Sequence, residues 1–410
     1  MKQQILNSIE NPSELENLYH QNKKDFQKVF FEVYPTISEQ VIAQVWYERL
    51  KKKTAEKTLV SINWAQFIGL IVLVGTAIQF PNIFGLEADI YYAKYLAIIQ
   101  FAVLSIYFLN QNNSEKLYKF GIPAGFLLLA VIITLIHQGK VDDVFILSAI
   151  HLGGVGVGLF GLAYLGKDWK QSISRVNLLK LVGDLIIISG LLLLCAGISS
   201  VLTINLFESI HFPIGDFYGK NIVGWLLAPI PLVGVYLLQT NTQLVSKISP
   251  IIAKIFSPIA LVMLSTFLVV YLTNGQTKIQ DREFLLLFNG ILIAVLALIF
   301  FSVANRGVGQ TKSFGNYVLC LLGIVAILVN GVAFNAIIER ILEFGFSPNR
   351  LAVFGSNLLI LIHLLGTTIQ FVGVLFYNQP FQKVEKAVVQ FLPIYVIWFL
   401  LVGLGFPIIF

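Results

Sequence analysis

Residues 176–198 read VNLLKLVGDLIIISGLLLLCAGI, a stretch that is long enough as a helix to cross a membrane. An α-helix rises about 1.5 Å per residue, and the hydrocarbon core of a bilayer is about 30 Å thick. The whole chain has the same character, because 57% of its 410 residues are hydrophobic and 12% are charged. Soluble domains carry about 25% charged residues. The composition therefore excludes a water-soluble globule, a disordered chain and a nucleic-acid-binding protein.

Apolar stretches of similar length follow one another from Ser61 onward. They predict eleven spans, at 62–81, 90–109, 118–137, 144–165, 176–198, 221–239, 251–273, 283–304, 314–334, 349–377 and 388–408. We therefore expect an all-α polytopic membrane helix bundle over residues 61–410, preceded by a small cytosolic helical module over residues 1–60. The connection 199–220 mixes aromatic and charged residues, which is typical of an interfacial or a re-entrant segment.

The basic residues predict how the chain is oriented. If the N-terminus is inside, most of the 28 Lys and Arg lie inside. They occupy the N-terminal module and the loops around Lys116/Lys119, Lys167/Lys170/Arg175, Lys247/Lys254, Arg306/Lys312 and Lys383/Lys386. Inner loops of membrane proteins carry such an excess of positive charge. The sequence thus predicts a cytoplasmic N-terminus and a C-terminus outside.

The N-terminal module shows the signals of three helices. The first two are expected near 11–18 and 24–33, the second ending before Pro35. Thr36 and Glu39 have the spacing of a capping box and predict the start of the third helix. Its apolar residues recur on one helical face: Ile42, Val45, Trp46 and Leu50.

The tenth span carries polar residues at intervals of seven, with one more a turn after the histidine: Asn349, Ser356, His363, Gln370 and Tyr377, then Thr367. Such a spacing keeps them within one broad stripe, which must avoid lipid. One interpretation is a solute path, in which His363 gains and loses a proton near neutral pH. The other is hydrogen bonding between helices. The sequence leaves both open.

Two earlier spans hold further candidates for a polar pathway. Asp184 lies well inside a span, and Lys180 lies one turn earlier on the same helical face. They form either a proton or cation site or a structural ion pair near the inner interface, with Lys180 reaching outward. His151 is a candidate for a hydrogen bond inside the bundle. Gly154 and Gly158 have the small-residue spacing that predicts close helix packing.

Residues 335–348 are expected to form a short amphipathic helix that ends at Gly345. Ser347 and Pro348 then have the positions of a cap and a first-turn proline for the next helix. Three residues form a candidate charge cluster at the outer face: Glu339, Glu343 and Arg350. Arg350 is expected to pair with one of the two glutamates, or alternatively to recognise an anion.

Motifs of an enzyme are missing from the sequence. It contains no metalloprotease motif, no nucleophile elbow and no P-loop. Cys195 and Cys320 both lie in apolar runs, so neither a disulfide framework nor a cysteine-based metal site is expected. We therefore expect no enzymatic activity, no cofactor and no bound metal.

The element Gly345-Phe346-Ser347-Pro348-Asn349-Arg350 resembles one in a family of bacterial multi-pass inner-membrane proteins of unknown function. In that family, a Gly-aliphatic-Thr/Ser-Pro-Asn-Arg element precedes a late transmembrane helix. This chain departs from the element at Phe346, where the family has an aliphatic residue. The stretch from Leu18 to Leu50 is similar to the cytosolic lead of such proteins. The resemblance implies a bacterial inner-membrane protein and names no substrate.

Two functions fit these features. The first is a secondary transporter or permease for a small solute, indicated by the polar stripe, Asp184 and proline-broken helices without an ATPase motif. The alternative is a non-transporting sensor or scaffold in which residues 1–60 bind a cytosolic protein. The expected partners are the lipid bilayer, a small solute and that cytosolic protein, with no nucleic acid. An intramembrane enzyme ranks third.

Overall fold

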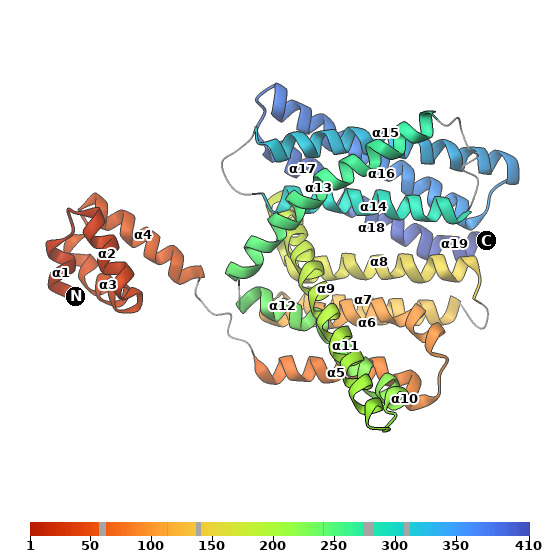
Figure 1. Cartoon of the computed structure of the whole chain (residues 1–410), viewed down its shortest axis with the longest axis horizontal. Helices are drawn as coiled ribbons and strands as arrows, with labels where there is room; N and C mark the ends of the chain where they lie inside the picture. The colour runs from red at the N-terminus through yellow and green to blue at the C-terminus, as the bar shows by residue number, and fades with distance from the viewer. Residues whose placement is uncertain (57–62, 113, 137–140, 241, 274–281, 307–311) are drawn as a thin grey trace. The chain divides into compact units, whose positions relative to one another are not determined.

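The computed structural model describes residues 1–56, 63–112, 114–136, 141–240, 242–273, 282–306 and 312–410. The chain divides into two compact units, Met1–Asn63 and Trp64–Phe410. Both units consist of helices, and the described residues include no strand (Figure 1).

The N-terminal unit has four helices: α1 (Lys2–Asn7), α2 (Pro12–Gln21), α3 (Lys23–Ile37) and α4 (Val41–Glu56). The Asn11 side chain caps α2 by accepting a hydrogen bond from the Glu14 amide at 3.3 Å. The helices enclose an aromatic core, in which Phe26 and Phe30 are fully buried. The Trp46 ring lies 5.2 Å from that of Phe26, between centroids. The unit therefore has a hydrophobic core of its own.

The predicted end of the second helix before Pro35 is wrong. Pro35 lies inside α3, which continues to Ile37 because that side chain is buried and extends the apolar face of the helix. The predicted capping box is wrong too. The Thr36 hydroxyl donates to the carbonyl of Val33 at 2.7 Å, and α4 begins only at Val41.

The apolar face of α4 is also narrower than predicted. Trp46 and Leu50 are buried in the core and Ile42 packs against it. Val45 instead lies outside this face and is 61% exposed, and Val41 one turn earlier is 73% exposed. Val45 therefore belongs to the surface of the unit.

The second unit is a bundle of long helices. The first helices in chain order are α5 (Trp64–Phe84), α6 (Ala88–Gln111), α7 (Lys116–Ile136), α8 (Asp143–Leu165), the short 3-10 turn η1 (Gly166–Lys170) and α9 (Ser172–Ser209). A broken run follows: α10 (Gly215–Tyr218), the π-helical turn η2 (Gly219–Val223), α11 (Gly224–Leu227) and α12 (Ile230–Thr240). Then come α13 (Thr242–Thr273), α14 (Arg282–Ala304), α15 (Phe314–Phe344) and α16 (Pro348–Phe376). The last run comprises α17 (Gln382–Gln390), α18 (Leu392–Leu400), the π-helical turn η3 (Leu401–Gly405) and α19 (Phe406–Ile409).

Within the described residues, ten helical runs are long and apolar enough to cross a membrane. The eighth predicted span corresponds to α14, whose apolar stretch within the described residues is shorter, Phe288–Ala304. The chain is thus an all-α polytopic membrane helix bundle, as predicted.

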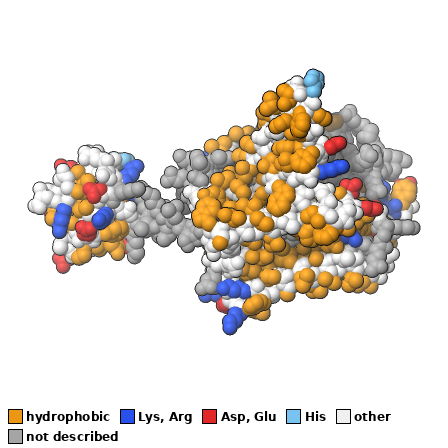
Figure 2. All heavy atoms as spheres, turned by 90° about the horizontal axis from the view of Figure 1, so that it is seen from below, with side chains coloured by type: hydrophobic (Ala, Val, Ile, Leu, Met, Phe, Trp, Pro, Cys, Tyr) orange, Lys and Arg blue, Asp and Glu red, His pale blue; other side chains and the backbone are white. Residues whose placement is uncertain are grey.

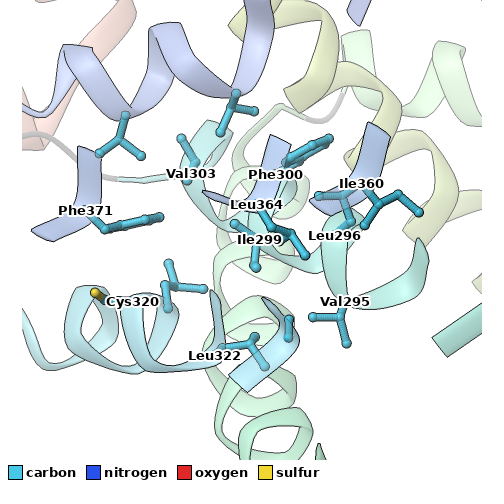
Figure 3. Close-up of a cluster of buried hydrophobic side chains, with 14 of the residues drawn as sticks. Val295, Leu296, Ile299, Phe300, Val303, Cys320, Leu322, Ile360, Leu364 and Phe371 are labelled. Carbon is cyan, nitrogen blue, oxygen red and sulfur yellow. The ribbon is translucent and has the colours of Figure 1, made fainter. Parts of the chain in front are cut away.

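The interior of the bundle has its main apolar cluster where α14, α15 and α16 pack together (Figure 3). Ile299, Leu322 and Leu364 lie at its centre and are at most 1% exposed. On the outside, apolar side chains cover much of the face of this unit seen in Figure 2. Soluble proteins rarely expose apolar patches of such extent, so this surface suits contact with lipid chains.

The connection predicted at 199–220 is shorter than expected. The single helix α9 runs for 38 residues to Ser209, and α10 begins at Gly215. The residues after Ile198 have no helix breaker before Pro213, so the backbone hydrogen bonds of α9 continue. Residues 199–209 therefore continue α9, and the connection is confined to residues 210–214. Its interfacial or re-entrant character stays a prediction.

The amphipathic segment predicted at 335–348 is likewise part of a longer helix, because α15 continues without interruption to Phe344. Gly345 ends it with a φ of +73°, a conformation that favours glycine. The Ser347 hydroxyl accepts from the Arg350 amide at 3.4 Å and caps α16, which starts at Pro348. The predicted helix end and the predicted cap are confirmed.

Candidate functional site

The polar stripe of α16 faces the interior of the bundle at His363. This side chain is fully buried. Its Nδ1 lies 3.1 Å from the Tyr395 hydroxyl of α18, and its ring stacks on that of Phe391 with 4.4 Å between centroids. On the α14 side, the Phe300 ring lies 4.6 Å away. Among the described residues, no hydrogen-bond partner reaches His363 Nε2.

Ser356 joins the stripe to the last helical run. Its hydroxyl accepts a hydrogen bond from Trp398 Nε1 at 3.0 Å. The neighbouring Gly355 makes room for the indole, because a Cβ there would collide with the Trp398 ring. This part of the stripe therefore forms interhelical contacts.

The rest of the stripe changes in burial along α16. Thr367 is 2% exposed, and its hydroxyl has no partner among the described residues. Asn349 and Gln370 are half-buried. Tyr377, at the end of α16, is 74% exposed. The stripe is thus fully interior only around His363 and Thr367.

Two buried asparagines lie on the facing helices α15 and α16, and neither is among the residues that the sequence predicts for a polar pathway. Asn330 is 0% exposed and Asn357 is 1% exposed. Within the described part of the chain, neither Nδ2 nor Oδ1 of Asn330 has a hydrogen-bond partner, and nor does Nδ2 of Asn357. In the sequence, each asparagine is a single amide within a long apolar run. The signal that could have identified it is its spacing from other residues on the same helical face.

Contacts between α15 and α16 on either side of the two asparagines place them at a similar level along the helix axes. On one side, the Thr368 side chain of α16 lies against Gly323 of α15. On the other, the rings of Phe334 and Phe354 stack with 4.9 Å between centroids. Both asparagines lie between these contacts, and α15 and α16 are antiparallel neighbours. They form a buried polar layer, which we call the asparagine layer.

Asp184 is buried, with 7% exposure. The residues beside it pack on other helices, Gly183 against Phe301 of α14 and Leu185 against Gly234 of α12. Lys180 is exposed, and the ion pairs of the described residues do not include one between it and Asp184. The predicted pairing is not formed, since Lys180 lies at the surface whereas Asp184 is buried.

His151 has local partners. Its Nδ1 lies 2.8 Å from the carbonyl of Leu147 on the same helix, and its ring meets the edge of Phe399 at 5.8 Å. Cβ atoms built on Gly154 and Gly158 would lie within 3 Å of Phe399 and Val396. The predicted close helix approach at these two glycines is confirmed, and His151 lies on the same packed side of α8.

The predicted charge cluster at the end of α15 takes another form. Arg350 Nη1 donates to the carbonyls of Phe344 at 2.8 Å and Gly345 at 2.7 Å. Glu339 accepts from Asn335 Nδ2 at 2.7 Å, and no ion pair of the described residues joins Arg350 to Glu339 or Glu343. The last carbonyls of a helix lack intrahelical donors, so the guanidinium binds them instead.

The described residues contain no group of three His, Cys, Asp or Glu side chains that could hold a metal ion. Two cavities, of about 460 and 600 Å³, are lined by residues of α6 to α9 and their connections. Neither is lined by His363, Gln370 or Asp184.

The fold and these buried polar groups define an integral, multi-pass membrane protein. The chain matches no protein-family model, no curated protein and no solved structure. The resemblance of the element at Gly345–Arg350 accordingly stays a prediction.

Proposed function

We propose that this protein is a secondary transporter or permease for a small polar solute, and that the asparagine layer lies on its path. The observation that carries the proposal is the burial of Asn330 and Asn357 with amide atoms that have no hydrogen-bond partner among the described residues. A buried polar group without a hydrogen bond costs about 1–3 kcal/mol. A solute, or the water that accompanies it, can supply the missing hydrogen bonds.

Breaks in the spanning helices support the same function. The run from α10 to α12 contains the π-helical turn η2, and Pro229 lies between α11 and α12. The last run contains the π-helical turn η3. Such turns are frequent at functional sites, and transporters use interrupted helices to change which side of the membrane a site faces.

The test compares asparagine variants in proteoliposomes. Stopped-flow light scattering measures entry of glycerol, urea and glycine into vesicles that contain the full chain. We expect the wild-type protein to speed the entry of at least one solute. Asn330→Leu and Asn357→Leu should each lower that rate at least about tenfold, while thermal stability stays unchanged or rises because the buried polar atoms are gone.

Asn335→Leu is the matched control, since Asn335 lies on the same helix but is exposed and bonds to Glu339. It should leave the flux unchanged. Flux that survives in both Asn330→Leu and Asn357→Leu would contradict the proposed path, as would entry of all three solutes at the rate of empty vesicles.

A second function rests on the N-terminal unit. Val41 and Val45 are 73% and 61% exposed and lie one turn apart on α4, so they form an apolar patch that a protein partner could cover. A photo-crosslinking residue placed at Val41 in cells should then give one dominant adduct, lost in Val45→Lys. The same photo-crosslinking residue placed at exposed Glu39 should give no dominant adduct. Identical adduct patterns from positions Val41 and Glu39 would rule against this scaffold function.

A further inference from the structure

A polar cavity of about 460 Å³ lies at one end of the bundle, where four membrane helices start or finish. Its lining includes Asn112, Glu115, Tyr118, Lys167, Asp168 and Ser174. The lining residues come from the end of α6, the start of α7, the end of α8 with η1, and the start of α9. The volume falls in the range of small-molecule sites, about 300–1,000 Å³.

Local contacts build the walls of this cavity. Asn112 Nδ2 donates to the carbonyl of Tyr164 at 3.1 Å and ties the end of α6 to the end of α8. Gly166 turns the chain into η1 with a φ of +53°, which favours glycine. Asp168 Oδ1 accepts from Gln171 Nε2 at 2.6 Å, which holds that carboxylate in place. The cavity thus has a defined shape.

The lining carries both signs of charge. Lys167 supplies a cation, while Glu115 and Asp168 supply carboxylates. The ion pairs of the described residues do not join Lys167 to either acid. Hydroxyls of Ser174 and Tyr118 add hydrogen-bond donors. A ligand with an anionic group and a nearby ammonium group complements such a lining.

Exposed apolar side chains lie next to the lining residues. Leu117 and Phe120 on the first turns of α7 are 77% and 74% exposed, and Ile173 at the start of α9 is 60% exposed. In a bilayer, side chains of this kind contact lipid chains. The neighbouring cavity then lies at the depth of the lipid headgroups.

We propose that this cavity binds the phosphoethanolamine headgroup of a membrane phospholipid. Lys167 and the hydroxyls bind the phosphate, and Glu115 with Asp168 accepts hydrogen bonds from the primary ammonium. Phosphatidylcholine has no N–H to donate to these carboxylates. Phosphatidylglycerol lacks the ammonium and meets two negative charges. This site is independent of the asparagine layer and of the proposed transport.

The test measures lipid binding to the full chain in detergent by native mass spectrometry. The probes are dihexanoyl-phosphatidylethanolamine, -choline and -glycerol, and soluble O-phosphoethanolamine. We expect the ethanolamine lipid to bind at least about tenfold tighter than the other two, which corresponds to about 1.4 kcal/mol. Lys167→Ala and Glu115→Gln should each abolish this preference.

Lys170→Ala is the matched control, because Lys170 is exposed in the same short η1 segment but has its ammonium over the Trp169 ring and does not line the cavity. It should keep the full preference. Equal binding of the three lipids, or an unchanged preference in both Lys167→Ala and Glu115→Gln, would overturn the proposal. Equally tight binding of soluble O-phosphoethanolamine would overturn the assignment to a lipid.

Discussion

At Gly355, α16 leaves room for the indole of Trp398, which then bonds to Ser356. The sequence shows a glycine in a long apolar helix and a tryptophan some forty positions later. Nothing in either pattern predicts that they meet, because the contact depends on how α16 and α18 are aligned. Their packing therefore gives Gly355 a role that its sequence context does not reveal.

We predict that Gly355→Ala destabilises the bundle. The added methyl group would collide with the Trp398 ring, and overpacking of this kind costs about 1–3 kcal/mol. The unfolding midpoint in detergent should fall accordingly. Gly366→Ala is the control on the same helix, since a Cβ there meets nothing within 4 Å. It should be neutral or stabilising, and an equal loss in both variants would contradict the packing argument.

A second residue-scale prediction concerns Arg350. Because its guanidinium donates to the carbonyls of Phe344 and Gly345, Arg350→Gln should lower stability by about 1.5–3 kcal/mol, the range for hydrogen bonds to charged groups. Glu339→Gln and Glu343→Gln should change it little. If either glutamate variant lowered the stability as much as Arg350→Gln in a thermal unfolding assay, the result would favour the ion pair expected from the sequence.

Among elements, α2 and α4 of the N-terminal unit are joined by an ion pair. Arg49 of α4 donates two hydrogen bonds to the Glu16 carboxylate of α2, one of them at 2.8 Å. These hydrogen bonds lower the pKa of Glu16 below its ordinary value of 4.5. Arg49 also lies over the Trp46 ring, 4.4 Å from its centroid. The pair thus fixes α4 against α2 at the edge of the aromatic core.

The pH dependence follows from the direction of that shift. A carboxyl with a lowered folded-state pKa adds stability that is complete above its unfolded pKa and is lost as the pH falls through the folded pKa. Hydrogen exchange of α2 and α4 in the full chain, corrected for intrinsic rates, should therefore accelerate below about pH 4.5. The effect should stay below about 1 kcal/mol, since the pair is at the surface. Glu16→Gln should remove the pH dependence, and an unchanged profile would exclude this pair as its cause.

At the scale of the whole molecule, the predicted number of spans sets the compartment of the C-terminus. An odd number places the two ends on opposite sides, and the basic residues favour a cytoplasmic N-terminus. Alkaline phosphatase fused after Phe410 should then be active, while green fluorescent protein at the same place should stay dark. The same two reporters at the N-terminus should give the reverse. A fluorescent C-terminal fusion would contradict either the odd number of spans or the orientation, and the N-terminal reporters decide between the two. Active alkaline phosphatase at the N-terminus would contradict the orientation, and with it the inner position of the polar cavity at Lys167.

Most of the architecture could be predicted from the chain because it depends on local properties. Apolar length determines where helices can span a membrane, and the glycine–serine–proline order at Gly345, Ser347 and Pro348 determines where α15 ends and α16 starts. The helix ends at Pro35 and near Ile198 were misjudged, because packing of Ile37 and the absence of a breaker before Pro213 extended α3 and α9.

By itself, the sequence determined that this is an all-α membrane helix bundle and that α16 carries a polar stripe, since both depend on the spacing of residues within single segments. Only the tertiary structure decided that His363 meets Tyr395, that Asn330 and Asn357 lie within the same stretch of the α15–α16 contact, and that Lys180 does not pair with Asp184. The physical reason is that such contacts depend on the register and rotation of helices far apart in the chain, which the packing of all their side chains sets together.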